Sequence, residues 1–352
     1  MKFIHLADVH LGASPDRGSA WNKRREEEIW ETFRRVIAEI RENPVDLLFI
    51  AGDLFHRQPL LRELKEVNAL FASIPDTRIY LIAGNHDYIR KDSLYRTFRW
   101  AENVCFFREE KVTSVKDPVC DVTVYGFSFL HQEIEREVLF GVVPEETEGL
   151  HILLAHGGDE RHVPVNYRSL SAAGFDYVAL GHIHRPNMPA RDQIRFSGAL
   201  EPLDRNDTGP HGYVEGQIIR GRLRTRFVPF ACRSYLDLAV KLDEETTQYS
   251  LEEQLKQGIR EQGPDNLYRV LLTGERSPEL ILIPERLKGL GNITELRDDS
   301  HPAYDLEVLY RQYSGTLVGD YIHHFLQLPE RTAVEEKALY YGLQALLETG
   351  RF

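Results

Sequence analysis

Five short apolar runs in this chain each end in side chains that can bind a metal ion. These endings are Asp8-Val9-His10, Gly52-Asp53, Gly84-Asn85-His86-Asp87, Ala155-His156 and Gly181-His182-Ile183-His184. Carboxylate and amide oxygens together with imidazole nitrogens bind divalent ions, and two such ions held side by side hydrolyse phosphate esters. One motif could arise by chance. Five in succession, each behind its own strand-like run, indicate a two-metal site.

Asp53 is the expected bridge between the two ions, because the glycine before it lets backbone and ions approach closely. The remaining expected ligands form two groups: Asp8, His10 and His184 for one ion, and Asn85, His156 and His182 for the other. A water held between the two ions is then expected to attack phosphorus in line.

Two residues after the third run are expected to assist the reaction. His86 directly follows Asn85 and would face the leaving oxygen, where it stabilises charge or donates a proton. Asp87 follows His86 and is expected to orient its imidazole, as carboxylates commonly do.

Apart from His56, histidines outside the five motifs are expected to be structural, since a lone histidine in a strand is usually a hydrogen-bonded core residue. They are His5, His131, His151, His162, His211, His301, His323 and His324.

The elements that carry the motifs alternate between strand and helix. Strands are expected at 3–7, 47–51 and 79–83, and helices between them have apolar residues at the helical period. This order favours a parallel sheet. Beyond residue 122 strands dominate, ending in a hairpin over 213–228. The pattern predicts an α/β (α+β) fold in which two sheets pack face to face with helices outside.

The motifs stop well before the end of the chain, which indicates two domains. Residues 1–235 contain every expected ligand. Residues 236–352 contain none and are predicted to form a smaller mixed α/β domain.

The composition argues against a membrane protein and against a disulfide-rich or zinc-binding small domain. A hydrophobic fraction of 42% and a charged fraction of 28% describe an ordinary globular protein. No apolar run is long enough for a membrane helix, and the N-terminus enters a strand directly. The three cysteines form neither a zinc motif nor a disulfide framework. A cytoplasmic location without membrane contact is therefore expected.

The net charge of −12 argues against a nucleic-acid-binding function without excluding it. Residues 236–352 carry 21 acids and 12 bases, and residues 1–235 carry 34 acids and 31 bases. Two divalent ions would bring this first part to about +1.

The motifs resemble those of the calcineurin-like metallophosphoesterases, with every expected ligand position filled over roughly the first 200 residues. The resemblance implies a β-sandwich of mixed sheets flanked by helices, with a dinuclear metal site at one edge.

Within that superfamily, Asp8-Val9-His10-Leu11-Gly12 and Gly52-Asp53-Leu54-Phe55-His56 resemble SbcD-type DNA repair nucleases, particularly the YhaO-like bacterial group. In that family a histidine three residues after the bridging aspartate contributes to exonuclease action, and His56 occupies this position. The alternative is a surface histidine that caps the following helix. Residues 236–352 would correspond to the capping domain that binds DNA or a partner.

This resemblance implies manganese-dependent cleavage of DNA and partnership with an SMC-like ATPase of the SbcC kind. Iron or zinc would fit the same ligands. A homodimer formed through the helix at 60–74 is a further expectation. Two other functions stay open: a phosphodiesterase or phosphatase acting on a nucleotide or another small phosphoester, and a regulatory subunit with a vestigial site. A regulatory subunit with a vestigial site is expected to lack at least one metal ligand, and every expected ligand is present in this sequence.

Overall fold

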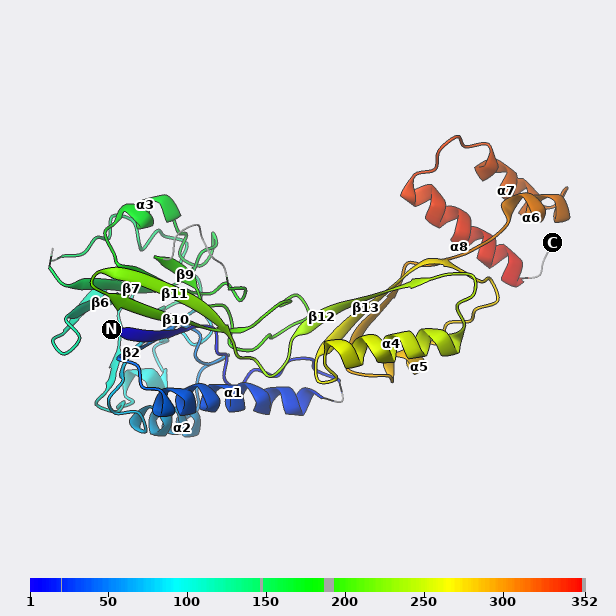
Figure 1. The fold of residues 1–352 in the computed structure, drawn as a ribbon. Coiled ribbons are helices and arrows are strands. Elements are labelled where there is room, and N and C mark those ends of the chain that lie inside the picture. The colour runs from blue at the N-terminus through cyan, green and yellow to red at the C-terminus, as the bar shows by residue number, and fades with distance from the viewer. Residues whose placement is uncertain (20, 146–147, 187–192, 350–352) are drawn as a thin grey trace. The chain divides into compact units, whose positions relative to one another are not determined.

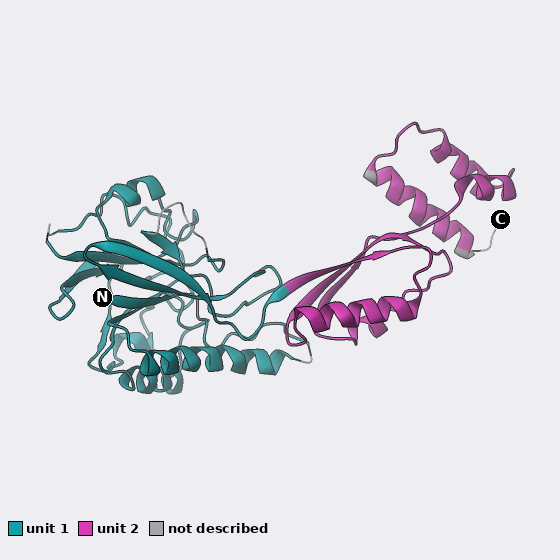
Figure 2. Cartoon of the chain, viewed as in Figure 1, with its two compact units in different colours: residues 1–235 teal, residues 236–352 magenta. Residues whose placement is uncertain are grey.

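The computed structural model describes residues 1–19, 21–145, 148–186 and 193–349. The chain divides into two compact units, Met1–Tyr235 and Leu236–Phe352 (Figure 2). The first unit contains two sheets.

The first sheet has six strands in the order β11-β10-β1-β2-β3-β4. Their bounds are β1 (Lys2–Leu6), β2 (Leu47–Ala51), β3 (Arg78–Ile82), β4 (Val104–Phe106), β10 (Gly212–Ile219) and β11 (Arg222–Pro229). Strands β1 to β4 are parallel, while β10 runs antiparallel to β1 and forms the predicted hairpin with β11. The sheet is therefore mixed.

The second sheet has five strands in the order β5-β6-β7-β8-β9. Their bounds are β5 (Thr113–Asp117), β6 (Val122–Gly126), β7 (Leu150–His156), β8 (Tyr177–Gly181) and β9 (Ile194–Phe196). Strands β6 to β9 are parallel and β5 is antiparallel.

Apolar side chains from both sheets form the layer between them. Phe3 and Phe49 of the first sheet pack with Leu154 and Tyr177 of the second. Helices α1 (Asn22–Glu42) and α2 (Leu61–Ala72) cover the outer face of the first sheet (Figure 1). The short helix α3 (Tyr167–Ala172) lies on the outer side of the second sheet, and a 3-10 turn, η1, spans Leu94–Arg96. The predicted sandwich of mixed sheets flanked by helices is confirmed.

The second unit combines a small sheet with helices. Its strands are β12 (Tyr235–Leu242), β13 (Leu267–Arg276), β14 (Ile293–Asp298) and β15 (His301–Pro302). Helices α4 (Gln248–Gln262) and α5 (Pro284–Lys288) pack on this sheet. Helices α6 (Leu306–Gln312), α7 (Leu317–Leu326) and α8 (Ala333–Thr349) share a separate apolar cluster.

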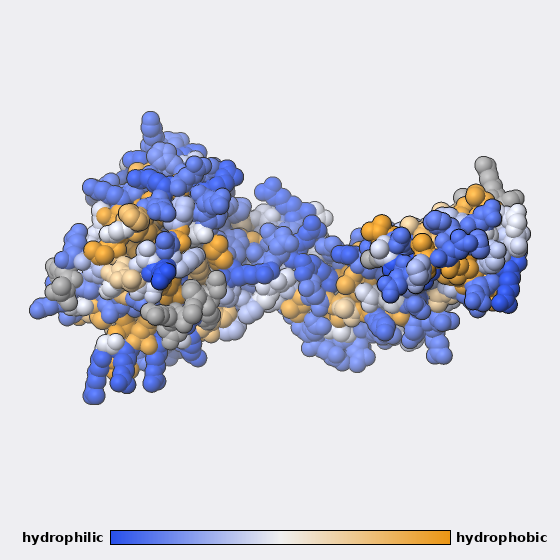
Figure 3. Space-filling view, turned by 90° about the horizontal axis from the view of Figure 1, so that it is seen from above, coloured by the Kyte–Doolittle hydropathy of each residue, from blue (hydrophilic) through white to orange (hydrophobic). Residues whose placement is uncertain are grey.

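Within the described part of the chain, no helix combines the length and the apolar character that crossing a membrane requires. Hydrophilic residues cover most of the face seen in Figure 3, with smaller groups of hydrophobic residues between them.

Candidate metal centre

The five motifs meet because they follow strands that end at one edge of the sandwich. Strands β1, β2 and β3 are parallel neighbours, as are β7 and β8 in the facing sheet. Contacts of β2 with both β7 and β8 bring the two sets of strand ends together. Side chains predicted from five separate places in the sequence therefore share one site.

The backbone at this edge is unusual. Asp8, His10, Asp53 and His182 all have positive φ angles, of 50°, 52°, 51° and 97°. Such conformations cost on the order of 1–3 kcal/mol each for a residue with a side chain. They persist because the surrounding hydrogen bonds hold them, as when the backbone N–H groups of Asp8 and His10 donate to the β2 loop.

The first expected ligand group is assembled. Nε2 of His10 lies 3.2 Å from Nε2 of His184, 3.7 Å from an oxygen of Asp53 and 4.0 Å from an oxygen of Asp8. Asp8 and His10 have no exposed surface, and Asp53 is 1% exposed. One buried point is thus surrounded by two carboxylates and two imidazoles.

The second expected group is assembled as well. The amide oxygen of Asn85 lies 2.9 Å from Nε2 of His156 and 3.2 Å from Nδ1 of His182. The Asp53 oxygen that faces His10 lies 3.4 Å from Nε2 of His156. Asp53 therefore sits between the two groups, as a bridging ligand must.

The other ring nitrogens show which atoms are free to bind metal. Nδ1 of His156 lies 2.9 Å from the carbonyl of Ala51, Nδ1 of His184 lies 3.0 Å from Asp207, and Nε2 of His182 lies 2.7 Å from Asp159. Carbonyl and carboxylate oxygens only accept, so each of these nitrogens donates a proton. The opposite nitrogen then keeps a lone pair directed into the site.

These lone pairs give a test of whether a cation fits. Nε2 of His156 and Nδ1 of His182 both face the Asn85 oxygen, and Nε2 of His10 faces Nε2 of His184. Acceptor atoms repel one another at such distances unless a proton or a metal ion lies between them. Mixed nitrogen and oxygen donors suit Mn²⁺, Fe²⁺ or Zn²⁺. The side chains therefore fit two divalent ions.

Electrostatics agree with a site built for cations. Burial lowers the pKa of His156, but the Asp53 carboxylate outweighs it and raises that pKa to about 9. Burial likewise lowers the pKa of His184, and Asp207 and Asp8 outweigh it to raise that pKa to about 9. Metal ions bind deprotonated imidazole, so these are the protons that metal binding must displace.

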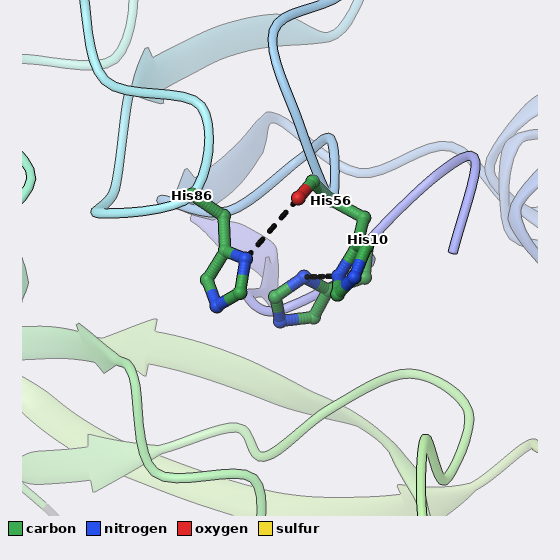
Figure 4. A group of neighbouring side chains, drawn as sticks. All are labelled: His10, His56 and His86. Carbon is green, nitrogen blue, oxygen red and sulfur yellow. Dashed lines mark hydrogen bonds between the residues drawn. The ribbon is translucent and has the colours of Figure 1, made fainter. Parts of the chain in front are cut away.

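His56 and His86 lie beside His10 at the rim of the site (Figure 4). The rings of His56 and His86 stack, with centroids 4.9 Å apart, and Nδ1 of His86 donates to the carbonyl of His56 at 3.1 Å. Nδ1 of His56 lies 3.3 Å from Nδ1 of His10. His86 is exposed, so its Nε2 can reach a substrate.

Asp87 does not orient His86 directly, which corrects the sequence analysis. Its buried carboxylate accepts the backbone N–H groups of Gly84 and Phe55, at 2.8 and 3.2 Å, and the hydroxyl of Tyr95 at 2.9 Å. A carboxylate directly after a tight loop binds that loop's own amides first. Asp87 thus ties the Asn85 loop to the His56 loop and acts on the site through the backbone.

His162 was expected to be structural, and it lies next to the candidate metal centre. Its Nδ1 lies 2.9 Å from Asp159, and its ring centroid lies 4.6 Å from that of His182. His5, by contrast, is a buried core residue whose Nδ1 lies 2.9 Å from the Tyr177 hydroxyl, as expected.

Asp159 and Asp207 were not identified from the sequence. Asp159 lies three residues after His156 in a Gly-Gly-Asp segment, which was a usable signal. Asp207 lies in an irregular segment that no spacing rule connects to His184.

Residues 1–186 match the calcineurin-like phosphoesterase family, and the chain belongs to it. The protein is therefore a metal-dependent phosphoesterase, and the predicted superfamily is confirmed.

Among individual relatives, the chain is 27% identical over 307 residues to the uncharacterized metallophosphoesterase YhaO of Bacillus subtilis, covering 80% of this chain and 74% of that protein. It is 28% identical over 255 residues to the DNA double-strand break repair protein Mre11 of Methanopyrus kandleri, covering 63% of this chain and 55% of that protein. It is 26% identical over 224 residues to the DNA double-strand break repair protein Mre11 of Methanocaldococcus jannaschii, covering 59% of this chain and 58% of that protein. The chain thus spans somewhat more than half of each of these two Mre11 proteins. These relatives agree with the predicted YhaO-like branch.

Proposed function

We propose that this protein is a two-metal nuclease that cleaves phosphodiester bonds in DNA. The observation that carries the proposal is the convergence of acceptor atoms from Asp8, His10, Asp53, Asn85, His156, His182 and His184 in two groups that share Asp53. Two divalent ions bound there supply Lewis acidity and activate water. The resemblance to SbcD-type enzymes favours manganese.

The chain's own residues supply the rest of the chemistry. Nδ1 of His86 donates to the His56 carbonyl, which leaves Nε2 for the substrate; when the ring is doubly protonated, Nε2–H can donate a hydrogen bond or its proton to the leaving oxygen. The Asp87 carboxylate fixes the loop that carries His86. His56 stands next to both His86 and His10, where its Nε2 can contact a phosphate.

Two arguments favour DNA over a small phosphoester. The Mre11 relatives are named as DNA double-strand break repair proteins. His56 also stands at the position that contributes to exonuclease action in SbcD-type enzymes, and it lies at the rim of the site rather than remote from it.

The experiment compares duplex DNA with a small chromogenic diester. Purified protein with Mn²⁺ is given end-labelled duplex and bis(p-nitrophenyl) phosphate in parallel. The informative variant is His56→Asn, because the asparagine oxygen can replace Nδ1 as the acceptor for His10 while the Nε2 end is removed. His131→Asn serves as the matched control, since this histidine is exposed and pairs with Glu110.

The nuclease proposal predicts that wild-type protein shortens DNA. It also predicts that His56→Asn lowers DNA cleavage at least about tenfold more than diester cleavage, within the range of a positioned acid–base or phosphate contact. Cleavage of the small diester alone would reject DNA and favour a phosphodiesterase or phosphatase of small phosphoesters.

The second unit and the partners follow from the same resemblance. We propose that residues 236–352 form a capping domain that binds DNA or a partner, that the partner is an SMC-like ATPase of the SbcC kind, and that the protein acts in the cytoplasm. We also propose a homodimer through the 60–74 helix, where Leu60 and Leu61 are 42% and 48% exposed. A monomeric mass by light scattering would reject the dimer.

A further inference from the structure

Asp159 contacts the candidate metal centre, and the chemistry proposed above gives it no role. One of its oxygens, Oδ2, lies 2.7 Å from Nε2 of His182, an expected ligand of the second ion. Asp159 comes from the loop after strand β7, whereas His182 follows strand β8. The contact therefore links two separate segments at the metal centre.

His182 differs from the other imidazoles of the site. His10, His156 and His184 direct Nε2 inward, but His182 directs Nδ1, which lies 3.2 Å from the Asn85 oxygen. Nδ1 is the nitrogen nearer the main chain, so it reaches the ion only in a restricted ring orientation. A side chain in this position benefits from a partner that fixes both the ring and the location of its proton.

The backbone alone does not fix that ring. His182 has a φ angle of 97°, and its N–H donates to the carboxylate of Asp8 at 2.9 Å. These contacts hold the main chain, and the rings of His156 and His162 pack against the side chain, with centroids 5.3 and 4.6 Å from that of His182. The hydrogen bond of Nε2 to Asp159 adds what packing does not supply, because it fixes which ring nitrogen carries the proton.

Asp159 is itself held by several hydrogen bonds. Its other oxygen, Oδ1, accepts the backbone N–H groups of Arg161 and His162, both at 2.8 Å, and Nδ1 of His162 lies 2.9 Å from the same oxygen. Nδ1 of His162 also lies 3.0 Å from Oδ2, so the carboxylate is anchored through both oxygens while Oδ2 contacts His182. This is how a carboxylate that orients a metal-binding histidine is commonly arranged.

We propose that Asp159 is a positioning residue that holds His182 with Nδ1 toward the second metal ion and thereby sets the affinity for that ion. His162 supports Asp159 through Nδ1, which lies 2.9 and 3.0 Å from the two carboxylate oxygens. The inference rests on the two-metal part of the proposed function, but it does not depend on the substrate being DNA.

The test measures Mn²⁺ binding to chelator-treated full-length protein by isothermal titration calorimetry. Wild-type protein is expected to bind two ions. Asp159→Ala is expected to weaken one of the two sites about 10- to 100-fold, the usual effect of losing a carboxylate that orients a ligand, and to leave the other within about threefold. Asp159→Asn keeps an acceptor oxygen and is expected to retain more affinity than alanine.

Glu160→Gln is the matched control. Glu160 is the next residue along the chain, is exposed, and has no hydrogen bond or ion pair among the described residues, so the same change in charge should leave both sites unchanged. Asp207→Ala provides the opposite case. Asp207 contacts His184, so its loss should weaken the first site instead.

Activity supplies a second readout. If Asp159 acts through metal affinity, excess Mn²⁺ should restore cleavage of the chromogenic diester by Asp159→Ala, with a raised half-activating concentration. Normal binding at both sites in Asp159→Ala would overturn the inference, as would an asparagine variant as weak as alanine. Loss of both sites together with a lowered melting temperature of the metal-free protein would make Asp159 merely structural and would overturn it too.

These outcomes separate the inference from the nuclease proposal. Wild-type protein that binds two ions but leaves DNA intact would reject the DNA substrate and leave the Asp159 result standing. DNA cleavage with unaltered metal binding in Asp159→Ala would reject only the role of Asp159.

Discussion

Gly181 is a residue at which the packing of the two sheets bears directly on the candidate metal centre. It ends strand β8 and faces the ends of strands β1 and β2. A Cβ atom there would collide with the carbonyl oxygen of Ala51, and would lie 2.7 Å from Cβ of Ala7 and 2.8 Å from Nδ1 of His156. Backbone and short buried side chains cannot rotate away, so Gly181→Ala must push the two sheets apart locally.

The size of the effect follows from the atoms displaced. Overpacking a buried position costs about 1–3 kcal/mol. The hydrogen bond from His156 to the Ala51 carbonyl lies at the same point, and its loss adds about 1 kcal/mol. We therefore expect Gly181→Ala to lower the free energy of unfolding of the first unit by about 2–4 kcal/mol. Because His156 also loses its orienting partner, we expect Mn²⁺ affinity to fall at least about tenfold.

Urea unfolding of the metal-free protein and Mn²⁺ titration measure the two effects separately. Gly289→Ala is the control, because the nearest atoms to its added Cβ lie at ordinary distances of 3.4 and 3.6 Å. A Gly181→Ala protein with wild-type stability and unchanged Mn²⁺ affinity would refute the reasoning that close sheet contact positions the ligands.

Three further outcomes are expected. Tyr95→Phe removes the hydroxyl that donates to buried Asp87, and urea unfolding should show a loss of about 1 kcal/mol; no loss would show that this bond contributes nothing. Burial raises the pKa of Asp117, but hydrogen bonds from backbone amides and a tyrosine outweigh it and lower that pKa. A carboxyl group with a lowered folded pKa stabilises the protein above its unfolded pKa, about 3.9, and loses that effect as the pH falls. Asp117→Asn should therefore destabilise the protein clearly at pH 7 and little near pH 2, and equal losses at both pH values would contradict this. Asp207→Ala should raise the Mn²⁺ concentration needed for half-maximal diester cleavage about tenfold by releasing His184, and an unchanged requirement would be evidence against its role.

Much of the candidate site could be predicted because its expected ligands follow strands with a clear pattern. Asp53 and Asn85 come directly after apolar runs, and parallel strands place such positions at one edge of a sheet. His156 and His182 lie in a second sheet, and the prediction that the sheets face each other brought them to the same edge. The convergence of these expected ligands was therefore accessible to reasoning from periodicity and chemistry alone.

The partners of these side chains were not accessible in that way. Asp159 and Asp207 lie in irregular loops, and only the three-dimensional path of those loops shows that they reach His182 and His184. Asp87 was assigned to His86 because the two are adjacent, but adjacent side chains on a loop need not face each other. Hydrogen bonding to nearby backbone amides decided its position instead.

The most direct test of the central claim is to count the bound metal ions and ask whether they share Asp53. Metal-free protein is titrated with Mn²⁺ and followed by electron paramagnetic resonance, alongside Asp53→Asn. The account predicts two Mn²⁺ per chain with the signal of a spin-coupled pair, and loss of that coupling in the variant. A single bound ion, or two uncoupled ions in the wild-type protein, would contradict it.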